Sequence, residues 1–288
     1  MKRFHPYLIA ALCALILPSA GQFTDFLSDS RQNATQPDGE ATLTSEVSAI
    51  APGESFTVAI EVTHPDGWHS YYKNSGGVEL PPEITWSLPA GFSHGPILWP
   101  TPKLFRGDLS LNIGYANGPV LLTTITPPAD LESGREVTLA AEVTWQYCAP
   151  GRCLNDDASL SITLPVAESA QIDPAQRDYF ATARAAQPTP VGDQWDIAVT
   201  RRGSEITLRL TPENADTRVE KIAFIPDQKF IQPVDFTQPQ REDNRFILPL
   251  KQATDVEDKT IPIDADTLSG IVKLSDGTEL QFNDIAFT

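Results

Sequence analysis

Short apolar runs alternate with proline and glycine clusters through the first half of the chain. The runs cover residues 56–62, 84–88, 120–125 and 137–145. Runs of this length, separated by turn residues, are typical of strands in an antiparallel sandwich. The pattern therefore predicts a β-sandwich domain over residues 41–168.

A different pattern follows. Asp173 and Pro174 have the form of a helix cap and a first-turn proline, and the alanine-rich stretch 175–186 comes next. The segment 188–190 contains two prolines and ends this helix, because a proline disfavours helical geometry in the residue before it. We expect residues 169–190 to form a short helical and proline-rich linker.

Apolar runs resume beyond this linker, at 195–199, 206–210, 219–225, 246–250, 271–274 and 280–285. Alternation is strict at Ile206, Leu208 and Leu210, between which Thr207 and Arg209 face the other way. A second, smaller sandwich is predicted over residues 191–288. The fold class expected for the chain is all-β, with two antiparallel β-sandwich domains joined by the linker.

The first twenty residues have the pattern of a secretory signal peptide. Lys2 and Arg3 precede an apolar stretch over 8–17, which ends in small residues up to Ala20. We expect residues 1–20 to be cleaved and residues 21–40 to form a flexible leader, which places the mature chain in the periplasm. Cys13 follows Leu12 rather than a small residue, so a lipid-attached cysteine is a minor alternative. No later run reaches the length of a membrane span, and no membrane insertion of the mature chain is expected.

Acidic residues outnumber basic ones by 38 to 21, which gives a net charge of −17. Such a charge argues against nucleic acid as a partner and would attract basic protein surfaces. General acidity of a secreted protein is favoured over a dedicated acidic site as its explanation.

The sequence around the two cysteines that would remain after cleavage is the most informative part of the chain. Residues 137–145 and 160–164 both alternate, which predicts a hairpin-like pair of strands with a long tip over 146–158. Cys148 and Cys153 lie in this tip, and Pro150-Gly151 between them supplies a turn that can bring them within disulfide distance.

A disulfide across so small a ring stabilises the fold weakly. The chain-entropy estimate is about 2 kcal/mol for about six residues, against nearly 5 kcal/mol for about a hundred. Stability alone therefore explains the pair poorly, and disulfide exchange is favoured over a structural loop clamp, which stays open as the alternative. Arg152 would favour a thiolate while Asp156 and Asp157 would oppose it, so the sequence does not predict a strongly lowered cysteine pKa.

Other site chemistries receive less support. His64, His69 and His94 could join the cysteines in a metal site, but they lack the close ligand pairs of zinc sites. Neither cysteine lies in a hydrolase nucleophile motif. Asp156 and Asp157 are interpreted as a solvated face rather than as a carboxylate pair for glycoside chemistry. An aromatic group could bind a sugar or a peptide but is interpreted as core; its members are Trp68, Tyr71, Tyr72, Trp86 and Trp99.

Five motifs together carry a resemblance to a known family over residues 42–166. They are GWHSYYKN at 67–74, ITWSLP at 84–89 followed by Gly91-Phe92, GPILWP at 95–100, VTWQYC at 143–148, and the segment from Cys153 to Pro165. In these motifs the chain resembles the amino-terminal periplasmic domain of the disulfide reductase DsbD and its copper-suppressor relatives.

The resemblance implies an immunoglobulin-like sandwich that works as a thiol-disulfide oxidoreductase without a cofactor. Electrons would come from a membrane-embedded partner and pass through Cys148 and Cys153 to soluble, thioredoxin-like periplasmic proteins. Cys153 would form the mixed disulfide and Cys148 would resolve it. A cap loop would shield the pair; the segment 107–115 is the nearest match, with Ile113 and Tyr115 as shields. A role in copper handling is suggested only by the link of these relatives to copper tolerance.

The sequence departs from the full-length family, because neither a multi-span membrane region nor a carboxy-terminal thioredoxin domain follows. We therefore expect a separate membrane protein to supply electrons, or a stand-alone module that has kept the fold and lost the pathway. The predicted second domain contains no cysteine and is expected to be a spacer or docking sandwich. Partner identity, the direction of electron flow and the oligomeric state are open at this point.

Overall fold

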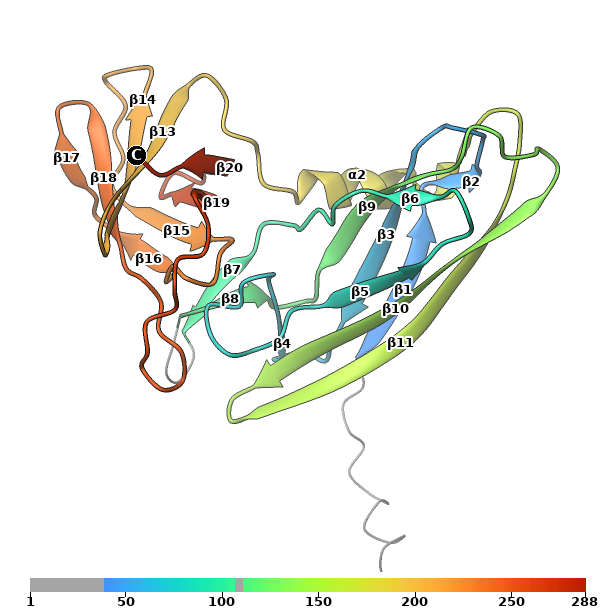
Figure 1. The fold of residues 1–288 in the computed structure, drawn as a ribbon, viewed down its shortest axis with the longest axis horizontal. Coiled ribbons are helices and arrows are strands. Elements are labelled where there is room, and N and C mark those ends of the chain that lie inside the picture. Colours follow the sequence, from blue (N-terminus) through green and yellow to red (C-terminus); the bar gives the residue numbers. More distant parts are fainter. Residues whose placement is uncertain (1–38, 107–110) are drawn as a thin grey trace, which may run out of the picture. The chain divides into compact units, whose positions relative to one another are not determined.

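The chain is built almost entirely of antiparallel strands in the computed structural model, which describes residues 39–106 and 111–288 (Figure 1). The predicted signal peptide, and the predicted leader up to residue 38, lie outside the described residues. The described part confirms the all-β fold class.

Two sheets and a short ribbon form from residues 40–172. The first sheet has the order β1-β3-β9-β6, the second has the order β11-β10-β4-β8-β7 with β5 also paired to β10, and the ribbon joins β12 to β2. The strands are β1 (Glu40–Ser45), β2 (Val47–Ala49), β3 (Phe56–Thr63), β4 (His69–Tyr71), β5 (Glu83–Ser87), β6 (Ser93–His94), β7 (Lys103–Arg106), β8 (Leu111–Tyr115), β9 (Val120–Thr126), β10 (Glu136–Ala149), β11 (Arg152–Pro165) and β12 (Gln171–Ile172).

Residues 195–286 form two further four-stranded sheets, with the orders β13-β14-β18-β17 and β16-β15-β19-β20. Their strands are β13 (Trp195–Arg202), β14 (Glu205–Pro212), β15 (Ile222–Pro226), β16 (Val234–Thr237), β17 (Gln240–Glu242), β18 (Arg245–Leu250), β19 (Thr267–Leu274) and β20 (Glu279–Ala286). Five of the six apolar runs predicted in this half lie within strands, and the run 219–225 lies on β15 only from Ile222 onward. Apolar side chains of these strands fill the core between the two sheets.

Helical structure is confined to the segment between these two sets of sheets, within the described residues. The 3₁₀ turn η2 (Pro174–Gln176) leads into α2 (Arg177–Ala185), and the Asp173 carboxylate accepts a hydrogen bond of 2.9 Å from the Ala175 N–H. The predicted cap and helix are thus confirmed. Phe180 is fully buried against Ala59 and Leu122, so α2 packs on the sheet that contains β3 and β9.

Polar and apolar contacts join the strands near β4 to the second half of the chain. Asp227, just after β15, accepts hydrogen bonds from the Tyr72 hydroxyl at 2.8 Å and from Lys73 Nζ at 2.6 Å. Asn74 Nδ2 donates to the carbonyls of Pro226 and Gln228, both at 3.0 Å. Residues 38–288 accordingly form one compact unit. Its division into domains at 41–168 and 191–288 stays a prediction.

Candidate functional site

The two cysteines lie at the end of the longest hairpin, formed by β10 and β11 (Figure 1). The strands pair without a register shift from Glu136 opposite Pro165 to Ala149 opposite Arg152. Only Pro150 and Gly151 connect them, and Gly151 has a φ of 73°, which is the left-handed geometry that the third residue of a proline-glycine turn adopts. A regular ladder therefore continues to the turn.

The prediction of a long tip over 146–158 is wrong in its extent. Asn155, Asp156 and Asp157 are poor strand formers, and their composition alone indicates a loop. Backbone pairing continues through them, and Gln146 Nε2 reaches Asn155 Oδ1 across the ladder at 3.0 Å. The cysteines consequently sit on paired strands rather than in an irregular loop.

A disulfide joins Cys148 to Cys153, which are directly opposite each other in the ladder. Their surroundings differ. Cys148 is buried, with 6% of its surface exposed, whereas Cys153 is exposed. A thiolate from another molecule therefore reaches the sulfur of Cys153 more easily than that of Cys148.

His69 and Phe105 complete the surroundings of the pair. His69, the first residue of β4, is the partner of Cys148 on the other side of β10. Directly opposed residues in a sheet point to the same face, so the register aligns Cys153, Cys148 and His69 in one row across β11, β10 and β4. The ring of Phe105 in β7 lies over the imidazole, with 4.2 Å between ring centroids.

From the sequence, His69 is predicted only as a possible metal ligand, and Phe105 is not predicted as a site residue. His69 lies inside the GWHSYYKN motif, so the sequence contains a signal for this residue. Its pairing with Cys148 depends on the order β10-β4-β8-β7, in which strands far apart in sequence are neighbours. The apolar pattern of one strand does not contain that information.

Charged groups near the cysteines lie mainly on the opposite face of the hairpin. Arg152 stacks over the ring of Trp68 at 5.6 Å, and Trp68 packs edge-on against Tyr147. The Asp156 carboxylate accepts a hydrogen bond of 2.6 Å from the Tyr147 hydroxyl and another from the Gly39 N–H. These residues alternate with the cysteines along the strands, so they face away from the disulfide.

Asp156 and Asp157 do not form a carboxylate pair. They are consecutive in β11, opposite Trp145 and Thr144, and therefore point to opposite faces of the sheet. The interpretation of the aromatic group as core is confirmed, because Tyr71 and Tyr72 are buried and the three tryptophans pack against buried clusters.

Ile113 and Tyr115, the predicted shields, lie in β8 and are buried. Tyr115 is opposite Ser70, which is opposite Tyr147, so the register directs Tyr115 to the face away from Cys148. Its hydroxyl donates a hydrogen bond of 2.8 Å to the Pro100 carbonyl. Residues 107–110 of the predicted cap segment lie outside the described residues. Shielding by Ile113 and Tyr115 stays a prediction, and Phe105 is an aromatic side chain on the cysteine side, in contact with His69.

Of the three histidines, His69 lies beside the cysteine pair, and His64 and His94 lie elsewhere. His64 stacks on Tyr147 and His94 lies against Trp86, at 6.2 Å between ring centroids in each case, while His69 contacts Phe105. Within residues 39–106 and 111–288, no group of three or more metal-binding side chains is arranged around a common point.

Burial controls the protonation of the groups beside the disulfide. It lowers the pKa of His69, and the nearby His64 adds to this effect, so both favour the neutral imidazole. Burial and, secondly, the charge of Glu79 raise the pKa of Tyr71 to about 12. The strand next to Cys148 thus presents an uncharged surface with a basic imidazole nitrogen.

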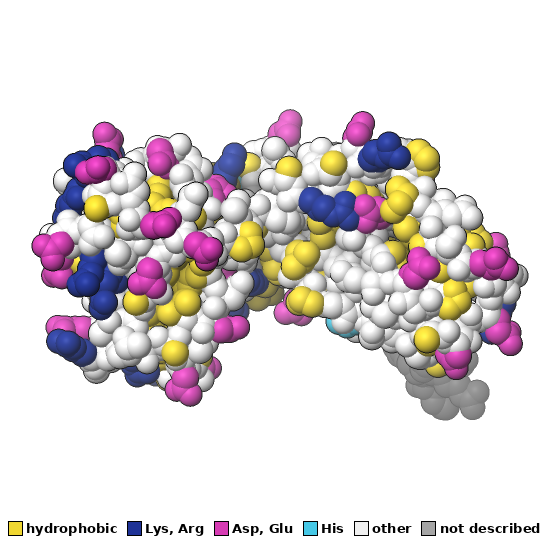
Figure 2. All heavy atoms as spheres, turned by 90° about the horizontal axis from the view of Figure 1, so that it is seen from above, with side chains coloured by type: hydrophobic (Ala, Val, Ile, Leu, Met, Phe, Trp, Pro, Cys, Tyr) yellow, Lys and Arg dark blue, Asp and Glu magenta, His cyan; other side chains and the backbone are white. Residues whose placement is uncertain are grey.

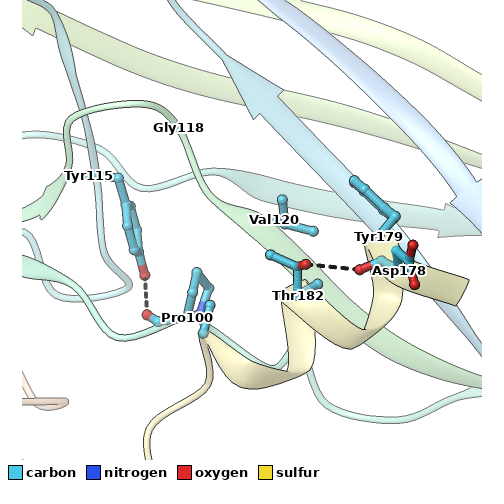
Figure 3. Close-up of a pocket in the computed structure, with 9 residues that line it drawn as sticks. Pro100, Tyr115, Gly118, Val120, Asp178, Tyr179 and Thr182 are labelled. Atoms are coloured by element: carbon cyan, nitrogen blue, oxygen red, sulfur yellow. Dashed lines mark hydrogen bonds between the residues drawn. The ribbon is translucent and has the colours of Figure 1, made fainter. Parts of the chain in front are cut away.

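A hollow in the described surface lies away from the cysteines, between α2 and the strands β8 and β9 (Figure 3). It has a volume of about 450 Å³ and is lined mainly by apolar atoms. Three of its lining side chains are already hydrogen-bonded: Thr182 donates to the Asp178 carbonyl, Tyr115 to the Pro100 carbonyl (Figure 3), and the Tyr179 hydroxyl to Glu61 Oε2. We therefore assign no site to it. Acidic side chains are scattered over the face shown in Figure 2 rather than gathered in one patch.

Fold and site together define an all-β, immunoglobulin-like protein with a disulfide at the end of a surface hairpin. Residues 39–165 match the family model described as "Thiol:disulfide interchange protein DsbD, N-terminal". The match supports a DsbD-N-like domain over this segment.

Among solved structures, the chain is similar to the N-terminal periplasmic domain of ScsB from Proteus mirabilis. The TM-score is 0.63 at 22% identity, and the match covers 88% of this chain and 97% of that one, which shows a shared fold. The Escherichia coli chaperone DraB matches at a TM-score of 0.20 and 9% identity, over 84% of this chain and 96% of its own, and carries no argument. A search of curated proteins found no match. No helix in the described part is long and apolar enough to span a membrane.

Proposed function

We propose that this chain is a periplasmic thiol-disulfide exchange protein that relays electrons through a reversible Cys148–Cys153 disulfide. The observation that carries the proposal is the unequal exposure of the two cysteines at the end of a fully paired hairpin. Cys153 is open to another protein, and Cys148 is held beside it as a buried residue. This arrangement suits a two-step exchange, whose rate depends on access to the sulfur that is attacked.

In the reducing step, a thiolate of the electron donor attacks the exposed sulfur of Cys153. The bond between Cys153 and Cys148 breaks, Cys148 leaves with the electron pair, and a mixed disulfide joins Cys153 to the donor. A second donor thiol then displaces Cys153, so the donor becomes a disulfide and this chain a dithiol. The reverse sequence, with the disulfide of an electron acceptor, returns the chain to the oxidised state.

The family of the domain supports the proposed partners. A DsbD-N-like domain suggests a membrane-embedded electron donor and soluble, thioredoxin-like acceptors, and both act in the periplasm. The pattern of residues 1–20 favours the same compartment. Phe105, beside His69, is the side chain that we propose as a shield of the pair between encounters.

The hairpin explains how the disulfide can open without loss of the fold. Its strands are held by backbone pairs up to the turn and by the buried side chains of β10 behind the cysteines. Because the ring that the disulfide closes is small, opening it removes only about 2 kcal/mol of stability.

A mild dithiol should therefore reduce the native protein completely. Near-ultraviolet circular dichroism should stay native-like, and urea unfolding should show a free energy lower by about 2 kcal/mol. Alkylation of both cysteines, followed by mass measurement, reports the reduction. If the cysteines become reducible only after the protein is denatured, the proposal is wrong.

A further inference from the structure

If the chain exchanges disulfides as proposed, on which this inference rests, Cys148 must react as a nucleophile from a buried position. To close the disulfide, its thiol must lose a proton, because the thiolate is the nucleophile. Cys148 is 6% exposed and lies among paired strands, and burial in such surroundings disfavours the charged thiolate. A neighbouring group that takes the proton would remove this barrier.

Two side chains on the cysteine face are placed beside the sulfur. Gln146 Oε1 lies 3.9 Å from Cys148 Sγ, but an amide is not a proton acceptor near neutral pH. His69 is directly opposite Cys148 on β4, a position at which Cβ atoms are about 4.5–5.5 Å apart in antiparallel sheets. The imidazole is the neighbouring group with the required chemistry.

The contacts of His69 hold it on this face. Phe105 covers the ring from β7 at 4.2 Å, and the half-buried position of His69 at the start of β4 limits its movement. The charged or titratable groups around it are His64 on the preceding loop, Tyr71 two residues along β4, Lys103 on β7 and Glu79 near Tyr71. Arg152 faces the other side of the hairpin, over Trp68.

We propose that His69 is the proton acceptor and donor for Cys148 during disulfide exchange. In the closing step, the Cys148 thiol gives its proton to the neutral imidazole, and the resulting thiolate attacks Cys153 Sγ in the mixed disulfide. The bond between Cys148 and Cys153 forms, the bond between Cys153 and the partner breaks, and the partner sulfur leaves with the electron pair. That sulfur takes up a proton from the imidazolium or from water. In the opening step, the neutral imidazole takes a proton from water and passes it to the departing Cys148 thiolate.

The lowered pKa of His69 is consistent with this role, since the ring is neutral and able to accept a proton at pH 7. A purely structural role predicts something different. If His69 served only to pack against Phe105, a phenylalanine in its place would preserve exchange at every pH.

The test compares His69→Phe and His69→Gln with the wild type, and uses His94→Gln as the matched control, because His94 lies against Trp86 and not beside the cysteines. Each protein is reduced, mixed with oxidised glutathione and quenched with acid at intervals, between about pH 5 and pH 8. The quantity measured is the rate at which the glutathione mixed disulfide converts to the internal disulfide. Urea unfolding of the oxidised proteins verifies that each variant is folded.

Both His69 variants should close the disulfide at least about 100-fold more slowly than the wild type and the His94→Gln control. The wild-type rate should change with a midpoint below pH 6.5, the ordinary pKa of histidine, and this midpoint should be missing from both variants. If the wild type exchanges and the His69 variants match its rates and its pH profile, the role of His69 is wrong and the proposed function stands. A folded wild type that forms neither product overturns both.

Discussion

The Cys148→Ala variant is expected to accumulate a mixed disulfide with a thioredoxin-like protein, while Cys153→Ala is not. The difference arises from exposure, because Cys153 is open to solvent and Cys148 is buried beside His69. Thiol-disulfide exchange requires access to the attacking sulfur as well as a thiolate. Both variants should stay folded, since each substitution removes only the small disulfide ring, which contributes about 2 kcal/mol to the free energy of unfolding.

The trapping experiment uses the chain without residues 1–20, so that the Cys148–Cys153 pair contributes its only cysteines. The partner is a thioredoxin-like protein with one active cysteine, supplied as its glutathione mixed disulfide. Cys153 displaces glutathione, and the trapped complex is read on a non-reducing gel. We expect at least about tenfold more complex with Cys148→Ala than with Cys153→Ala. A double variant without either cysteine measures the background. Equal trapping by the two single variants would contradict the assignment of Cys153 as the exchange cysteine.

Asp227→Ala should lower the free energy of unfolding by about 2–3 kcal/mol. The Asp227 side chain is 11% exposed and accepts from both the Tyr72 hydroxyl and Lys73 Nζ. Burial, with the charge of Asp227 as the second cause, raises the pKa of Tyr72 strongly. The phenol therefore stays protonated and donates a hydrogen bond to the carboxylate. Alanine leaves a buried hydroxyl and a partly buried ammonium group without this acceptor.

Asp235→Ala is the matched control for this substitution. Asp235 pairs with Arg106 at 2.7 Å, but the two side chains are 40% and 82% exposed. Exposed ion pairs contribute about 0–1 kcal/mol, so the control should unfold almost like the wild type. Urea unfolding measures both variants. A loss for Asp227→Ala no larger than that for Asp235→Ala would show that the Asp227 contacts do not stabilise the fold.

The strands of the fold could be predicted where the apolar pattern is long. β10 alternates through Val137, Leu139, Ala141 and Val143, and these side chains are buried as the pattern indicates. Short strands such as β4 and β7 were not predicted, because three or four residues do not establish a period. β4 exists because it lies between β10 and β8, and this pairing is a property of the whole sheet.

The candidate site, like the fold, could be predicted from the sequence only where local pattern determines it. The pairing geometry of Cys148 and Cys153 could be inferred from the turn at Pro150-Gly151 between two matching patterns. Their unequal exposure, and the position of His69 opposite Cys148, depend on which strand lies beside β10. The sequence contains His69 within a motif, but its distance of 79 positions from Cys148 gives no local sign of the contact.

The reduction potential of the native Cys148–Cys153 pair tests the account most directly. The protein is equilibrated with glutathione buffers of known potential, the free thiols are alkylated, and circular dichroism verifies that the fold persists. An exchange protein should show a potential between about −180 and −270 mV. A potential below about −300 mV would identify a structural bond that partners cannot reduce, and would contradict the electron relay.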